Sequence, residues 1–141
     1  MTIARRGATL LELAIALAVL AIVLGIALPS QAASRDAASV RAATRELVDL
    51  LATARELAVA RGAAAVHLDS AAGVARLRAP GAPPRDLPLG ALHGVRVEAS
   101  RDSLAFDGRG LGRGAANLRV VVHRGAAADT VVVSRLGRVR F

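Results

Sequence analysis

The chain of 141 residues contains no cysteine, no lysine, no tryptophan and no tyrosine, and aromatic residues make up only 1% of it. The lack of cysteine excludes disulfide bonds, cysteine-ligated zinc and a thiol nucleophile. The lack of aromatic side chains leaves any core to valine, leucine, isoleucine and alanine. All the basic residues are arginines, and the net charge of +8 creates a cationic surface that attracts phosphates or anionic lipids.

The sequence has one long apolar run, which lies near the N-terminus. Residues 1–7 form a short polar leader that ends in Arg5, Arg6 and Gly7. Residues 8–28 are almost wholly apolar, and as a helix they would span about 31 Å, which matches a hydrocarbon core of about 30 Å. The arginines before this run would stay in the cytoplasm. The pattern therefore predicts a single-pass transmembrane helix with the C-terminus outside.

After Pro29 the pattern changes to that of an amphipathic helix. Apolar residues recur at steps of three and four, which places their side chains on one helix face. This face consists of Val40, Ala43, Leu47, Leu50, Leu51, Ala54, Leu57 and Ala58. Gly62 follows Arg61 and is typical of a helix stop. One long helix is therefore expected from near Ala8 to near Arg61, and its second half, 29–62, packs one face on a domain.

Residues 63–141 have the pattern of a β-rich head. Short apolar stretches alternate with glycine-rich turns, which indicates an antiparallel sheet or two packed sheets. The expected strands are 64–69, 73–78, 95–98, 103–106, 118–123, 130–134 and 138–141, with turns at 107–114 and 124–128 and a loop at 80–88, which holds four prolines. The sequence predicts an α+β fold, in which a long, partly transmembrane N-terminal helix packs on a C-terminal antiparallel sheet or β-sandwich.

The chain carries no convincing motif for catalysis or for a cofactor. The glycine-rich stretch 108–114 lacks the lysine and the terminal Ser/Thr of a phosphate loop, so it is interpreted as a flexible turn. His67, His93 and His123 are far apart, lack the spacing of metal ligands and are each expected on a strand surface. No Ser-His-Asp arrangement stands out. We therefore expect a protein that is not an enzyme and that binds no metal or cofactor.

The stretch from Arg5 to Leu13 carries the functional signal. A basic leader ends in Gly7, an uncharged residue follows, and Glu12 is a lone charge just inside an apolar helix. This arrangement resembles the class III signal of type IV pilins and type II secretion pseudopilins. The resemblance implies that a prepilin peptidase cuts between Gly7 and Ala8 and that the new N-terminus is methylated, although Ala8 stands where the family usually has Phe or Met. Glycine suits the junction because it enters a narrow protease cleft without a side-chain clash.

Glu12 is the residue on which the assembly hypothesis depends. A carboxylate in the acyl region of a bilayer is costly, so an interaction should offset that cost. The resemblance implies that Glu12 pairs with the free α-amino group of Ala8 on a neighbouring subunit during assembly. Such a contact is strong in a low dielectric when both groups are matched. The alternative is a glutamate at the headgroup level that has no partner.

Two other interpretations of the N-terminus stay open. An ordinary secretory signal peptide would also have a basic start and an apolar stretch, and Ser30-Gln31-Ala32 offers a small-x-small cleavage site. An uncleaved signal anchor is the second. Glu12, the length of the apolar run and its continuation into a second helical stretch favour the prepilin interpretation.

Three later stretches resemble the GspH/FimT group of minor subunits. They are Leu50 to Gly62, Leu104 to Gly110 and Val131 to Arg140, and they occur in the order found in that group. The resemblance implies a long N-terminal helix that carries a β-sandwich-like head. It also implies a bacterial inner-membrane protein with its head in the periplasm, whose partners are prepilin peptidase and other pilin or pseudopilin subunits.

The group serves two machines. Pseudopilin H is a minor subunit of the type II secretion pseudopilus, and this function is the one we expect. The alternative is a FimT-like minor type IV pilin that binds DNA for natural transformation through a C-terminal Gly-Arg-x-Arg, here Gly137 to Arg140. Arg138 and Arg140 would share one face of a strand and could contact successive phosphates, joined by Arg124 or Arg135. We favour a solvated strand edge over DNA binding, because arginines there discourage edge pairing.

Overall fold

A computed structural model describes residues 9–113 and 117–141, and for residues 25–30 it describes the backbone alone. The chain divides into two compact units, an N-terminal unit, Met1–Ser34, and a C-terminal unit, Arg35–Phe141. Helix α1, Leu10–Arg61, contributes to both units and continues through Pro29. It ends before Gly62, whose φ of 87° is a left-handed conformation that glycine adopts readily. The predicted helix stop is thus confirmed.

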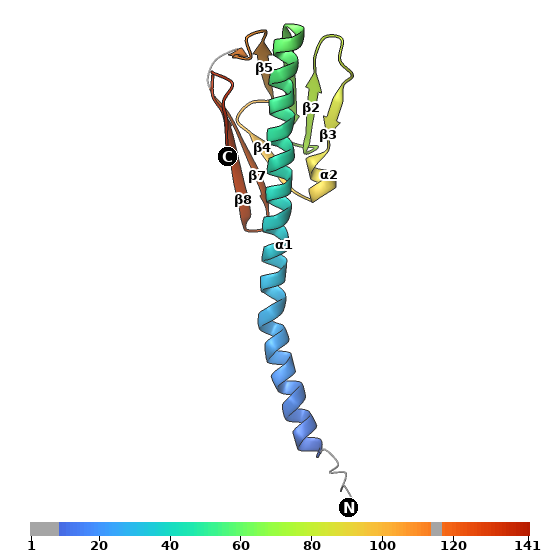
Figure 1. The fold of residues 1–141 in the computed structure, drawn as a ribbon. Coiled ribbons are helices and arrows are strands. Elements are labelled where there is room, and N and C mark those ends of the chain that lie inside the picture. Colours follow the sequence, from blue (N-terminus) through green and yellow to red (C-terminus); the bar gives the residue numbers. More distant parts are fainter. Residues whose placement is uncertain (1–8, 114–116) are drawn as a thin grey trace, which may run out of the picture. The chain divides into compact units, whose positions relative to one another are not determined.

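Two antiparallel sheets form the β-rich part of the C-terminal unit (Figure 1). The first has the order β3-β2-β1-β5-β6 and the second the order β4-β7-β8-β9. The strands are β1 (Ala63–Asp69), β2 (Val74–Arg78), β3 (Arg85–Leu87), β4 (Arg96–Ala99), β5 (Ser103–Asp107), β6 (Gly112–Arg113), β7 (Leu118–Arg124), β8 (Ala127–Val133) and β9 (Val139–Arg140). The predicted α+β fold, a long helix packed on an antiparallel β-rich head, is confirmed.

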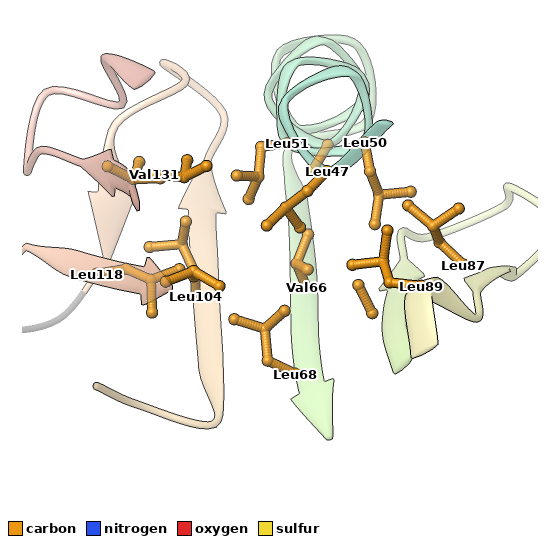
Figure 2. Close-up of a cluster of buried hydrophobic side chains, with 14 of the residues drawn as sticks. Leu47, Leu50, Leu51, Val66, Leu68, Leu87, Leu89, Leu104, Leu118 and Val131 are labelled. Atoms are coloured by element: carbon orange, nitrogen blue, oxygen red, sulfur yellow. The ribbon is translucent and has the colours of Figure 1, made fainter. Parts of the chain in front are cut away.

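The core of the C-terminal unit lies between α1 and the two sheets. The predicted apolar face of the helix is buried there, except that Leu57 is only half-buried. In Figure 2, Leu50 points toward Leu87 and Leu89, which belong to the part of the chain around β3. Leu51 points to the other side, where Val131 of β8 lies. One helix face therefore contributes to the core beside both sheets, which is why its apolar stripe is wide.

Three short elements differ from the sequence-based expectation. The proline-rich stretch contains β3 between Pro84 and Pro88, and β3 pairs with β2. Helix α2, Leu89–His93, follows directly and buries Leu89. The expected turn at 107–114 contains β6, which pairs with β5. All three are too short to show a periodicity, and pairing or burial against the rest of the unit decides their conformation.

The three histidines are placed only partly as expected. His67 is exposed on β1, and His123 lies on β7, where its Nε2 is 3.1 Å from Oε1 of Glu98 on β4. His93, in contrast, is the last residue of α2, so the expectation of a strand surface was wrong there. Among residues 9–113 and 117–141, no three His, Asp or Glu side chains come together in a way that could hold a metal ion.

Candidate functional site

The first turn of α1 has the hydrogen bonding of a helix cap. Thr9 precedes the helix, and its Oγ1 accepts a hydrogen bond from the backbone N–H of Glu12 at 3.2 Å. The backbone N–H of Leu13 donates to the carbonyl oxygen of Thr9 at 3.1 Å. Thr9 and Glu12 thus stand at the first and last positions of a T-x-x-E capping sequence. The residue at position 12 thus takes part in the cap through its backbone N–H, and its carboxylate lies near a helix N-terminus, where a negative charge is favourable.

The first part of α1, from Leu10 to Leu24, leaves its large apolar side chains uncovered. The large ones from Leu10 to Leu24 are between 48% and 88% exposed. They are Leu10, Leu11, Leu13, Ile15, Leu17, Val19, Leu20, Ile22, Val23 and Leu24. Such a distribution covers every side of the helix, and a helix that is apolar all round is normally buried. Across the described parts of the chain, no helix meets the combined length and apolar character that crossing a membrane needs.

The predicted processing residues, Gly7 and Ala8, lie outside the described residues. So does the amino group that was expected to pair with Glu12. Glu12 itself is exposed at the start of α1. The assembly contact therefore stays a prediction that depends on a neighbouring subunit.

At the other end of the chain, Arg138 and Arg140 belong to a tight hairpin between β8 and β9. The N–H of Gly137 donates to the carbonyl oxygen of Ser134 at 2.9 Å. The N–H of Ser134 donates to the carbonyl oxygen of Arg138, also at 2.9 Å. Gly137 has a φ of 70°, as the last loop residue of a three-residue hairpin requires. The glycine before Arg138 is thus explained by the turn alone.

A second turn of the same kind contacts the first. In the β5–β6 hairpin, the N–H of Gly110 donates to the carbonyl oxygen of Asp107 at 2.8 Å. The carbonyl oxygen of Gly110 lies so close to Gly137 that a Cβ added there would clash with it. Arg55 of α1 joins the two turns, because its Nε donates to the same carbonyl oxygen at 3.2 Å. The helix and both hairpins therefore hold the last strand in place.

Beside this junction lies a groove of about 810 Å³, which we call the α1–β9 groove. One wall comes from α1 and consists of Leu51, Ala52, Arg55, Glu56, Val59 and Ala60. The other wall consists of Gly137, Arg138, Val139 and Arg140. The structure thus brings the two arginines singled out in the sequence to one groove. It adds Arg55 and Glu56, which could not be singled out from the sequence, because their helical spacing is that of any solvent-facing residues.

Arg124, the other arginine considered for a phosphate track, has a structural role. Its Nε lies 2.8 Å from Oδ1 of Asp36, and its guanidinium also donates to Oγ of Ser39 at 3.1 Å and to the carbonyl oxygen of His93 at 2.6 Å. These bonds tie β7 to α1 and to the end of α2 within the C-terminal unit. Since its guanidinium makes three internal contacts, Arg124 is not a free phosphate-binding group.

The β5–β6 turn beside the groove contains a carboxyl group, Asp107, that accepts hydrogen bonds from the backbone. Hydrogen bonds from the N–H groups of Leu111 and Arg109 lower the pKa of Asp107. A lowered pKa in the folded state stabilises the fold above the unfolded value, and this stabilisation is lost as the pH falls through the folded pKa. The pKa values of Asp69 and Asp86 are lowered as well, the first mainly by the N–H of Ala72 and the second mainly by Arg78.

We therefore expect the melting temperature of the protein to fall as the pH is lowered from about 5 to about 2. Asp107→Asn keeps an acceptor oxygen for the turn but does not titrate, so its melting temperature should depend less on pH than that of the wild type. Thermal unfolding followed by circular dichroism at a series of pH values measures this. Identical pH profiles for the two proteins would show that Asp107 makes no contribution to acid sensitivity.

Comparison with known proteins adds two findings. Residues 3–28 match the prokaryotic N-terminal methylation motif. The fold is similar to that of the type IV minor pilin FimU of Pseudomonas aeruginosa, seen in two crystal forms. In the first crystal form, the TM-score is 0.60 at 18% identity, and the match covers 72% of this chain and 86% of the FimU chain. In the second, the TM-score is 0.58 at 18% identity, and the match covers 71% of this chain and 90% of the FimU chain. The chain thus combines a prepilin-type methylation motif with a type IV pilin fold.

The comparison with curated proteins finds no match. The two findings support the prepilin part of the sequence-based interpretation, since the motif covers both Gly7 and Glu12. The likeness to FimU, at 18% identity, concerns the fold. It agrees with the expected long helix and β-rich head, and it does not distinguish a pilus from a secretion pseudopilus.

Proposed function

We propose that this protein is a minor subunit of a pilin-type filament, anchored in the bacterial inner membrane by residues 8–28 with its C-terminal unit in the periplasm. The observation that carries the proposal is the N-terminal helix segment, which is apolar on all sides and holds a single charge, Glu12, between residues 8 and 34. The methylation motif over residues 3–28 supports it. A structural subunit needs no catalytic group, and we propose none.

The anchor is supported by the cost of leaving its side chains in water. Full burial of a leucine, isoleucine or valine is worth about 1.5–3 kcal/mol. The side chains from Leu10 to Leu24 lie uncovered in the isolated chain, so an apolar environment should stabilise the segment strongly. The acyl region of a bilayer, and then the packed helices of a filament, would supply that environment.

In this apolar environment the charge of Glu12 is unfavourable, so we propose that it is present because it takes part in assembly. An acidic side chain at the bilayer centre costs about 2.5–3.5 kcal/mol on insertion scales and less toward the interface. Thr9 caps the helix through the backbone N–H of residue 12, so this hydrogen bond does not require a glutamate, and glutamine would suit the capping sequence equally well. A negative charge is required only if a cation meets it, and the processed amino group of Ala8 on the next subunit is the cation we propose.

This distinction leads to a prediction. Glu12→Gln keeps a polar side chain of the same size and removes its charge, and Glu12→Ala removes both the polar group and the charge. We expect both variants to insert normally and to be incorporated into the filament at least about tenfold less, since removing one partner of a buried ion pair costs about 3–5 kcal/mol. Co-purification with the other filament subunits measures incorporation, and membrane fractionation measures insertion.

Asp49→Asn is the matched control, because it neutralises an exposed carboxylate further along the same helix. It should be incorporated like the wild type. Normal incorporation of Glu12→Gln together with poor incorporation of Glu12→Ala would mean that Glu12 acts through a neutral polar contact and not through an ion pair.

Of the two machines, we propose the type II secretion pseudopilus. The resemblance of residues 50–62, 104–110 and 131–140 to the GspH/FimT group is compatible with both machines, so the preference depends on the C-terminal arginines, which are considered below. A type IV pilus is the second candidate, and the similarity to FimU, a type IV minor pilin, concerns the fold alone and favours neither machine. Identification of the subunits that co-purify with the wild-type protein decides between them, because each machine has its own set of pilins.

In the second candidate, Arg138 and Arg140 would bind DNA, as in FimT-like proteins. Both arginines are exposed and line one groove, which supports this role. Glu56 in the opposite wall opposes it, because its carboxylate would face the phosphates. Neither Phe106, which is fully buried, nor Phe141, which lies outside the groove lining, is placed there to stack on bases. We therefore retain the secretion pseudopilus as the proposed function.

A further inference from the structure

The last strand, β9, has an edge that no strand in the described parts of the chain covers. It stands at the end of the order β4-β7-β8-β9 and pairs with β8 through Val132↔Arg140 and Val133↔Val139. Hydrogen-bonded and non-bonded pairs alternate along an antiparallel ladder. Since the N–H of Ser134 donates to the carbonyl oxygen of Arg138, the next pair, Val133 and Val139, is a non-bonded one.

It follows that the N–H and C=O of Val139 point away from β8. Val139 also lines the α1–β9 groove, so this donor and acceptor lie at the groove's own wall. An unpaired strand edge is a template for another extended chain, whose backbone can use both groups at once. The groove volume of about 810 Å³ lies within the range of about 300–1,000 Å³ that is typical of ligand sites.

The side chains of the groove define the chemistry of a suitable partner. Three arginines, Arg55, Arg138 and Arg140, line it together with one acid, Glu56. This excess of positive charge favours carboxylates. Val59, which is 57% exposed on the helix wall, adds an apolar contact. The groove thus offers main-chain pairing on one side, and guanidinium groups and an apolar surface around it.

We propose that the α1–β9 groove binds an extended, acidic segment of a partner protein, which adds to β9 as a further strand. Its backbone pairs with Val139, its carboxylates contact Arg138 and Arg140, and an apolar side chain lies on Val59. The inference goes beyond the filament role and does not rest on it. A second copy of this chain fits poorly, because pairing two β9 edges would bring their arginines together.

Nucleic acid is the competing anionic partner, and the geometry disfavours it. A phosphate backbone can accept from the N–H of Val139 but offers no donor in register for its C=O, whereas a peptide strand supplies both groups. Glu56 would also repel a run of phosphates more than it repels a peptide whose acidic side chains alternate with apolar ones. The two partners can be separated by experiment, since only a peptide depends on the strand edge.

The test uses the full chain in detergent and a fluorescent peptide of eight residues with alternating glutamate and valine. Binding is followed by anisotropy. Two changes remove strand pairing and leave the charges in place. Val139→Pro deletes the outward N–H, at an edge position where proline is tolerated because this N–H is not bonded to β8. Methylation of alternate backbone nitrogens of the peptide removes the peptide N–H that would donate to the C=O of Val139. This change leaves the protein itself unaltered, so it does not depend on the folding of a variant.

We expect the peptide to bind, and each of these two changes to weaken binding by about threefold to tenfold, which corresponds to one backbone hydrogen bond. Arg138→Gln/Arg140→Gln should weaken it by at least about tenfold, since two charge-assisted contacts are lost. Arg135→Gln is the matched control, because Arg135 is exposed in the same hairpin and does not line the groove. It should leave the affinity within about twofold of the wild-type value, since an exposed substitution away from the contacts has little effect.

Three results would overturn the proposal. The first is a peptide that does not bind at all. The second is binding that survives both Val139→Pro and backbone methylation, which would reduce the groove to general positive charge. The third is preference for duplex DNA over the peptide, with a salt slope that falls by about two units in Arg138→Gln/Arg140→Gln, which would assign the arginines to phosphates. None of these results depends on processing at Gly7, so the proposed filament role is tested separately.

Discussion

Phe106→Ala will lower the free energy of unfolding of the C-terminal unit by about 3–5 kcal/mol, the range for deleting a buried phenylalanine. Phe106 is fully buried on β5, whereas Phe141, the other phenylalanine, is exposed. Its cross-strand neighbours are Ala64 on β1 and Gly112 on β6. Both are too small to move into the space that the ring leaves, so a cavity should persist.

Chemical denaturation of a fragment that begins at Ser34 measures this effect. Domains of this size have stabilities of about 5–15 kcal/mol, so the loss is a large part of the total. His67→Ala is the control, because this exposed side chain lies on the neighbouring strand and should change stability by about 0.5 kcal/mol or less. A loss below about 1 kcal/mol for Phe106→Ala would contradict the described packing around Phe106. So small a loss would mean that the ring is not fully buried or that its neighbours fill the space it leaves.

The second large effect concerns processing. Gly7→Leu will leave residues 1–7 on the protein, because a branched side chain at the junction would clash in a narrow protease cleft. The uncut chain has its leader where the amino group of Ala8 would otherwise be free, so incorporation into the filament should be lost as well. Electrophoretic mobility and co-purification with the other subunits measure the two consequences.

Ala4→Leu provides the matched control, since it makes a similar change within the leader but three residues before the junction. It should be processed like the wild type. If Gly7→Leu were also processed normally, the junction would lie elsewhere and the prepilin interpretation of this segment would be wrong.

The sequence predicted the long elements well because each carries a periodicity of its own. The buried face of α1 repeats every three to four residues from Val40 to Ala58, and the structure buries that face. The alternation in β1, where Ala64, Val66 and Leu68 are buried, follows the period of two of a strand. In these segments, local pattern and tertiary packing demand the same conformation, so the pattern alone was sufficient.

The short elements could not be predicted in this way. β3 has three residues between prolines, and β6 has two residues in a glycine-rich stretch. Their strand conformation depends on hydrogen bonds to β2 and β5, which are visible only once those strands are in place. Helix α2 likewise has five residues and contains Gly90, so isolated helix propensity would reject it.

The processing signal and the α1–β9 groove also differ in whether a local sequence pattern marks them. Gly7 and Glu12 are recognised from sequence because their spacing along one helix is the signal. The α1–β9 groove joins residues 51–60 to residues 137–140, and no local pattern links them. Arg138 and Arg140 were noticed in the sequence, but their relation to Val59 and to the edge of β9 comes from the fold.

The intact mass of the wild-type protein extracted from membranes tests whether the chain is a processed prepilin. We expect a mature chain that starts at Ala8, with or without one added methyl group on its amino group. A chain that starts at Ala33 would indicate an ordinary signal peptide cut after Ala32, and a chain that retains Met1 would indicate an uncleaved anchor. Either of these two masses would contradict the proposed function.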